Sequence, residues 1–125
     1  MNGGETKMNA SFLSRMRRSD DDLDPAAAAA GSAEGTLLLV DVREPDEFRQ
    51  LHAPGAEPVP LGRLAAHLQR LGAAGKPVAF VCRSGSRSAM ATRQARQAGI
   101  DAHNVAGGML AQHIVTKGRS VEAMV

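Results

Sequence analysis

The sequence is poor in the residues that build several common kinds of site. Its 125 residues contain one cysteine, no tryptophan, no tyrosine and three phenylalanines. A single cysteine excludes an internal disulfide, and the shortage of aromatic rings removes the surfaces on which nucleic-acid bases stack. The four histidines, His52, His67, His103 and His113, are too widely spaced for a recognisable zinc pattern. We therefore expect no metal, no cofactor and no nucleic-acid partner.

Long apolar runs are also missing. No segment is long enough to cross a bilayer, and residues 1–5 lack the basic-then-apolar order of a signal peptide. The default expectation is a cytoplasmic protein without a membrane partner. A chain of this length can bury one sizeable core, so we expect a single domain.

Charge is distributed unevenly along the chain, although the net charge is only +2. The first 59 residues carry 6 basic and 11 acidic side chains, whereas residues 60–125 carry 9 basic and 2 acidic ones. The basic half contains Cys82. This distribution favours small anionic substrates.

The cysteine lies where a short apolar strand, residues 78–81, runs into a polar loop and then a helical pattern. Backbone NH groups and the positive end of a helix dipole converge on one point in such a loop. Arg83 and Arg87 add two guanidinium groups near the thiol. All of these favour a thiolate, so Cys82 is predicted to be a nucleophile rather than an inert residue at the end of a strand.

The rest of the chain alternates strand and helix signals. Asp24 and Pro25 predict the start of a helix that ends at Gly31. The leucines at positions 61, 64, 68 and 71 predict one face of a covering helix. Strands are predicted at residues 37–40, 58–59, 78–81 and 100–105, and a further helix is predicted at residues 88–98.

Several motifs resemble the rhodaneses, a family of sulfurtransferases. Cys82 is followed by four residues, then Arg87 and Ser88, as in the active-site loop of that family. The resemblance continues, in the family's order, in Asp41-Val42-Arg43-Glu44-Pro45-Asp46-Glu47-Phe48, in His52-Ala53-Pro54-Gly55-Ala56 and in Gly107-Gly108-Met109-Leu110-Ala111. Two residues depart from the family pattern: Leu51, where a glycine is usual, and Gln112, where tryptophan is frequent.

The resemblance implies a rhodanese-like α/β fold with a single parallel β-sheet and helices on both faces. It covers about residues 23–115 and leaves residues 1–22 as a disordered tail and residues 116–125 as a C-terminal tail. Phosphatases with a related loop have five residues between Cys and Arg. The four-residue spacing therefore disfavours a phosphatase or an arsenate reductase.

The resemblance also implies a reaction. Cys82 would take a sulfane sulfur from an anionic donor such as thiosulfate and form a persulfide, and cyanide or a thiol would then remove that sulfur. Arg83 points to thiosulfate, because family members that use it tend to have Arg after the cysteine. The implied substrate-binding loop consists of Arg83, Ser84, Gly85, Ser86, Arg87 and Ser88.

Some roles stay open at this level. Arg83 and Arg87 would either bind the donor or brace the loop, and the serines would either hydrogen-bond the persulfide or cap the helix. The supporting residues Asp41, Arg43 and Glu47 fit a site or an ion-pair network that fixes the loop. The alternative to an enzyme is a non-enzymatic persulfide carrier or regulatory binding module, in which a partner such as a sulfur-relay protein gives or takes the sulfur.

Overall fold

The computed structural model describes residues 22–108, which form a five-stranded parallel sheet in the order β1-β5-β4-β2-β3. The strands are β1 (Asp22–Leu23), β2 (Leu38–Asp41), β3 (Glu57–Pro58), β4 (Val78–Val81) and β5 (Ala102–Val105). The helices are α2 (Pro25–Glu34), α3 (Pro45–Gln50), the 3₁₀ helix η1 (Leu61–His67), α4 (Leu68–Ala73) and α5 (Ser86–Gln97).

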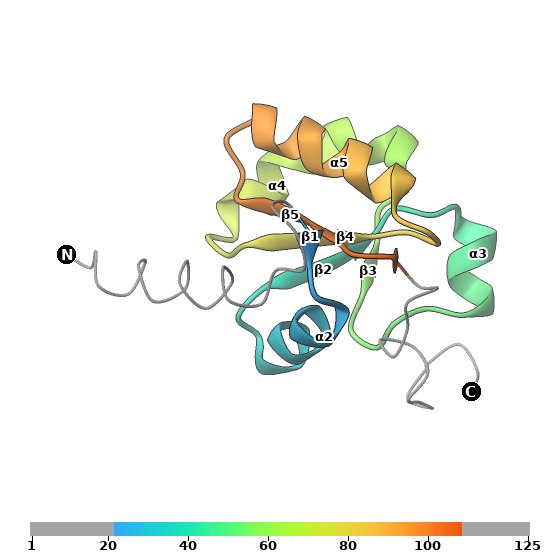
Figure 1. Cartoon of the computed structure of the whole chain (residues 1–125). Coiled ribbons are helices and arrows are strands. Elements are labelled where there is room, and N and C mark those ends of the chain that lie inside the picture. The colour runs from blue at the N-terminus through green and yellow to red at the C-terminus, as the bar shows by residue number, and fades with distance from the viewer. Residues whose placement is uncertain (1–21, 109–125) are drawn as a thin grey trace.

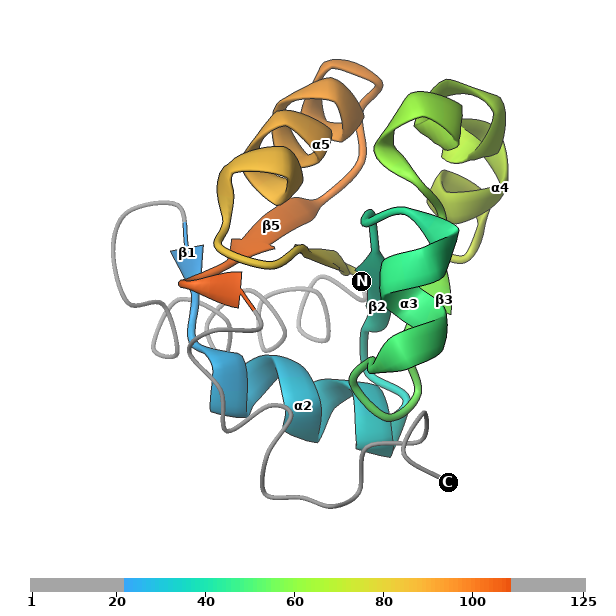
Figure 2. The same ribbon diagram turned by 90° about the vertical axis from the view of Figure 1, so that its right-hand side faces the viewer.

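Helices cover both faces of the sheet, which confirms the predicted α/β architecture. Helix α2 lies against one face, and α4 and α5 lie against the other (Figure 1). Figure 2, turned by 90°, shows the same two layers, with α2 on one side of the sheet and α4 and α5 on the other. In the part of the chain that is described, no helix is both long and apolar enough to span a bilayer.

The apolar run of β4 is divided between two cores. Successive side chains of a strand point to opposite faces, so Ala79 and Val81 pack on the side of α2. Val78, Phe80 and Cys82 pack on the side of α4 and α5. The cysteine is therefore placed on the face covered by the helix that follows it.

Helix α2 is longer than predicted, because Gly31 does not end it. The helix continues to Glu34 and ends at Gly35, whose φ of 78° is the left-handed conformation that glycine adopts readily. Gly31 is instead a site of close packing. A Cβ atom there would lie 2.7 Å from Cγ and Cδ2 of Leu37.

The prediction of a covering helix was correct about the buried face and wrong about a single continuous α-helix. Leu64 and Leu71 are fully buried, and Leu61 and Leu68 pack against the same core. The first part is the 3₁₀ helix η1, and α4 begins only at Leu68. A 3₁₀ helix repeats every three residues, which matches the spacing from Leu61 to Leu64.

Other boundaries differ by a few residues. Helix α5 begins at Ser86, two residues earlier than predicted. Asp22, predicted to lie in the N-terminal tail, forms part of β1.

Leu51 has an extended backbone with φ of −167°, which any residue adopts, so no glycine is needed there. The remainder of the N-terminal tail, the predicted turn into a helix after Gly108, Gln112 and the tail at 116–125 lie outside the described residues.

Replacing Gly31 tests the packing of α2. Alanine normally stabilises a helix interior relative to glycine by about 1 kcal/mol. In Gly31→Ala we expect the opposite, a loss of roughly 1–3 kcal/mol in the free energy of unfolding, because the new methyl group overpacks against Leu37. Urea denaturation measures the change.

Gly62→Ala is the matched control, since nothing lies within 4 Å of the added Cβ. It should leave stability unchanged or raise it slightly. Equal effects of the two substitutions would show that contact with Leu37 is not what limits position 31.

Candidate active site

The parallel sheet brings the predicted site residues to one edge. Asp41 is the last residue of β2, and Cys82 follows the last residue of the adjacent strand β4. Helices α3 and α5 begin just beyond these two strand ends. Crevices at the carboxyl ends of parallel strands are the usual ligand sites of open α/β sheets.

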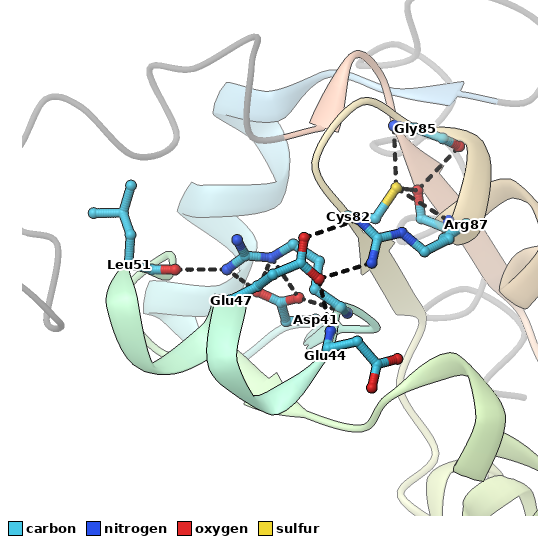
Figure 3. Close-up of polar contacts among 9 residues, drawn as sticks. Asp41, Glu44, Glu47, Leu51, Cys82, Gly85 and Arg87 are labelled. Atoms are coloured by element: carbon cyan, nitrogen blue, oxygen red, sulfur yellow. Dashed lines mark hydrogen bonds and ion pairs between the residues drawn. The ribbon is translucent and has the colours of Figure 1, made fainter.

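The sulfur of Cys82 is the centre of a small set of hydrogen bonds. Its Sγ accepts from the backbone NH of Gly85 at 3.1 Å and of Ser88 at 3.3 Å, and the Ser88 hydroxyl lies 3.3 Å away (Figure 3). Gly85 has a φ of 114°, which a residue with a side chain rarely adopts. Cys82 is only 1% exposed.

These contacts control the charge of the thiol. Burial raises the pKa of Cys82, but hydrogen bonds from the Ser88 hydroxyl and from the backbone NH groups of Ser88, Gly85 and Arg87 outweigh it, so the pKa is lowered overall. The direction is the one expected from the sequence. The main cause is hydrogen bonding rather than the charges of two arginines.

Arg87 braces the loop. Its guanidinium donates to both carboxylate oxygens of Glu47, at 2.8 and 3.1 Å, and Figure 3 shows it facing that carboxylate. Glu47 also accepts from the backbone NH of Glu44 at 2.8 Å, at the start of α3. The Arg87 hydrogen bond is the largest of the causes that lower the pKa of Glu47 to about 2.

Asp41 and Arg43 form a second, buried ion pair. Arg43 Nη2 donates to Asp41 Oδ2 at 2.8 Å and to the carbonyl of Leu51 at 2.6 Å, and both charged side chains are almost completely buried. The pair therefore fastens the end of β2 to the end of α3. Of the two roles left open for Asp41, Arg43 and Glu47, these contacts favour the network that fixes the loop.

The remaining loop residues face solvent. Arg83, Ser84 and Ser86 are exposed, and no hydrogen bond joins their side chains to the sulfur. Within residues 22–108 the Arg83 side chain has no ion-pair partner. Of the predicted loop residues, Gly85 and Ser88 contact Sγ, Arg87 is paired with Glu47 of α3, and Arg83 is exposed.

The histidines near this edge have structural contacts. His52 lies 2.8 Å from the carbonyl of Phe48 through Nδ1, and its ring stacks on the Phe48 ring at 3.8 Å. His67 Nδ1 lies 2.9 Å from Arg70 Nη2. Neither histidine is among the residues in contact with the sulfur.

Sequence reasoning did not assign Asn104. Its Oδ1 lies 2.5 Å from the Ser88 hydroxyl, and its Nδ2 donates to Asp22 at 3.2 Å. The available signal was an amide side chain within a predicted strand of the sheet, which must find partners when buried.

The specific role of Gly108 was also missed. A Cβ atom there would lie 2.4 Å from the carbonyl oxygen of Cys82 and 2.8 Å from that of Arg83. The end of the described chain therefore packs directly on the cysteine loop.

The fold and site define an α/β protein with an activated cysteine in a loop of inward-facing NH groups at the carboxyl edge of a parallel sheet. The chain matches the Rhodanese-like domain family over residues 24–113 and belongs to that family. The resemblance seen in the sequence is thereby confirmed.

Similar proteins include two with a sulfurtransferase name and one that is uncharacterised. The chain is 40% identical over 79 residues to the uncharacterised protein slr1261 of Synechocystis, a match that covers 62% of this chain and 44% of slr1261. It is 34% identical over 85 residues to "Putative sulfurtransferase YtwF" of Bacillus subtilis, covering 68% of this chain and 82% of YtwF. The human single-domain sulfurtransferase TSTD1 aligns with a TM-score of 0.61 and 30% identity over 72% of this chain and 92% of TSTD1.

Replacing Glu47 tests how much its ion pair with Arg87 contributes to stability. Because the pKa of Glu47 falls from 4.5 to about 2 on folding, its charge stabilises the folded state above pH 4.5, and this contribution is lost as the pH falls through 2. In Glu47→Gln we expect a loss of about 1 kcal/mol at pH 7, a reduced value because a third of the side chain is exposed. Chemical denaturation at several pH values should show the difference from the parent protein shrinking between pH 4.5 and 2.

Asp46→Asn is the control, since its ion pair with Arg49 is exposed on both sides. Exposed pairs contribute little to stability, so no measurable change is expected. A pH-independent loss in Glu47→Gln would contradict the electrostatic account of the brace.

Proposed function

We propose that the protein is a sulfurtransferase that moves a sulfane sulfur from thiosulfate to a thiophilic acceptor through a persulfide on Cys82. The observation that carries the proposal is the set of hydrogen bonds on Sγ, which lowers the pKa of the thiol in a nearly closed loop. The rhodanese-like family of the chain supports a transferase.

In the first step the Cys82 thiolate attacks the outer sulfur of thiosulfate. A bond forms between Sγ and that sulfur, the S–S bond of thiosulfate breaks, and sulfite leaves with the electron pair. The products are sulfite and a negatively charged persulfide. The outer sulfur then stands about 2 Å beyond Sγ, where the NH groups of the loop would stabilise its charge.

In the second step the acceptor attacks the outer sulfur. Cyanide forms a C–S bond, the persulfide S–S bond breaks, and Cys82 is released as the thiolate while thiocyanate departs. A thiol acceptor would leave in the same way as its own persulfide. Neither step needs an external oxidant or reductant, since the sulfane sulfur is passed on at its own oxidation level.

The dimensions of the loop support sulfur over phosphate as the transferred group. Four residues separate Cys82 from Arg87, one fewer than in phosphatases with a related loop, and a shorter loop favours a smaller transferred group. Arg83, exposed and unpaired within the described residues, would hold the sulfonate end of thiosulfate.

A direct assay tests the proposal. Thiosulfate treatment should add roughly 32 Da, one sulfur atom, to the parent protein, and cyanide should remove it with formation of thiocyanate. Cys82→Ser should show neither the added mass nor turnover. The same preparations are tested with an aryl phosphate, and hydrolysis of the phosphate without sulfur transfer would contradict the proposal.

The assay also separates the enzyme from a persulfide carrier. A carrier would keep the added sulfur when cyanide or a small thiol is present and would release it only to a protein partner. Stoichiometric loading without turnover would favour that alternative.

Arg83→Met tests the role of the exposed arginine. We expect KM for thiosulfate to rise by roughly tenfold, the effect of losing about 1.4 kcal/mol of binding. The pH midpoint of Cys82 alkylation should stay the same, because Arg83 is not among the groups that lower its pKa. Arg93→Met removes an equal charge from an exposed position of α5 and should leave KM unchanged. A shifted midpoint in Arg83→Met would instead place this arginine against the sulfur.

A further inference from the structure

The Ser88 hydroxyl has more acceptors than protons. Its oxygen lies 2.5 Å from Asn104 Oδ1, 3.2 Å from the Gly85 carbonyl and 3.3 Å from Cys82 Sγ. A hydroxyl donates one proton. A serine oxygen 2.5 Å from an amide oxygen must place that proton between the two, because an amide oxygen only accepts.

Asp22 determines which end of the Asn104 amide faces Ser88. Strand β5 lies between β1 and β4, and Asn104 pairs in register with Asp22 on one side and Phe80 on the other. Asn104 Nδ2 donates to Asp22 Oδ1 at 3.2 Å, which leaves Oδ1 directed at the serine. A flipped amide would put its oxygen against the carboxylate and is disfavoured by repulsion.

This arrangement places Asn104 in competition with the sulfur. While the Ser88 proton is held by Asn104, the serine presents a lone pair to Sγ and can accept from the S–H of a thiol, but it cannot donate to a thiolate. For Ser88 to donate to the sulfur, the hydroxyl must turn away from Asn104. The backbone NH groups of Gly85 and Ser88 have no such choice and always donate.

We propose that Asn104, oriented by Asp22, is a positioning residue that holds the Ser88 proton while Cys82 is uncharged and yields it when charge forms on Sγ. The inference rests on the proposed function for its place in the reaction. Charge is on Sγ before the attack on the donor and moves to the outer sulfur in the persulfide. The Ser88 hydroxyl would then donate to Asn104 again. Its hydrogen bond to Sγ would therefore stabilise the thiolate more than the persulfide.

Few other charges face this cluster from the described elements. Arg87 of α5 lies near the sulfur but is paired with Glu47 of α3, and Glu44 lies at the start of the same helix. Asp22 comes from β1. Substitutions of Asn104 leave all of these groups in place.

The test is the pH dependence of Cys82 alkylation by iodoacetamide in the full chain. Asn104→Leu keeps the approximate shape of the side chain and removes the competing acceptor, so the Ser88 proton becomes free for the sulfur. The alkylation midpoint should fall by roughly one pH unit, the size expected for one hydrogen bond to a charged group. A merely structural role, or a relay that activates the thiol, would leave the midpoint unchanged or raise it.

Asp22→Asn is the second variant and decides the question if Asn104→Leu does not fold. It removes the charge that orients the Asn104 amide, and the midpoint should again fall. Thr92→Val is the control, because it deletes another buried hydroxyl of α5, one that donates to the Ser88 carbonyl at 2.8 Å. Its midpoint should equal that of the parent protein.

The same measurements in a Ser88→Ala background show whether the effect passes through Ser88. In that background, Asn104→Leu should leave the alkylation midpoint unchanged. Asp22→Asn should shift the midpoint only by the small amount that the loss of its charge causes. If the midpoint falls as far in the Ser88→Ala background as it does with Ser88 present, the inference is overturned. Midpoints that stay unchanged or rise when Ser88 is present would also overturn it. Alkylation involves neither the sulfur donor nor the acceptor, so a failure of sulfur transfer in the separate assay would count against the proposed function and not against this inference.

Discussion

The structure depends on bringing several NH groups to one buried sulfur. Cys82 is 1% exposed, and a thiolate there is tolerable only because hydrogen bonds replace the lost water. The loop must therefore turn back on itself, which Gly85 permits with its φ of 114°. It must also be packed from outside, and Gly108 can approach the Cys82 carbonyl closely because it has no Cβ.

A loop of this kind has to be held rigidly. Two ion pairs hold it, one buried and one partly exposed to solvent. The buried Asp41–Arg43 pair fastens the end of β2 to the Leu51 carbonyl, and removing one partner would leave a charge without water or counterion. The half-exposed Glu47–Arg87 pair joins α3 to the first turn of α5. Both pairs therefore support the loop, whereas Arg83 is exposed and has no ion-pair partner within residues 22–108.

Sequence reasoning was accurate where a local pattern sufficed. It placed β4 at residues 78–81, identified Cys82 as the residue at its end and selected the leucines of the η1–α4 face. It was wrong about Gly31, because a glycine that ends a helix and one that admits a neighbour look alike in sequence. It expected the lowered pKa of Cys82 from loop NH groups, a helix dipole and two arginines together, and hydrogen bonds from the Ser88 hydroxyl and the loop NH groups are the causes that lower it.

The sequence by itself determined the α/β class, the position of Cys82 at the end of β4 and the residues of its loop, because strand periodicity and turn chemistry are properties of short segments. Only the tertiary structure decided which groups meet the loop. Arg87 pairs with Glu47 across 40 residues, and Asn104 reaches Asp22 across 82. Such contacts follow from strand order and register in the sheet, which bring distant segments together. The separation of two segments along the chain does not reveal how close they lie in space.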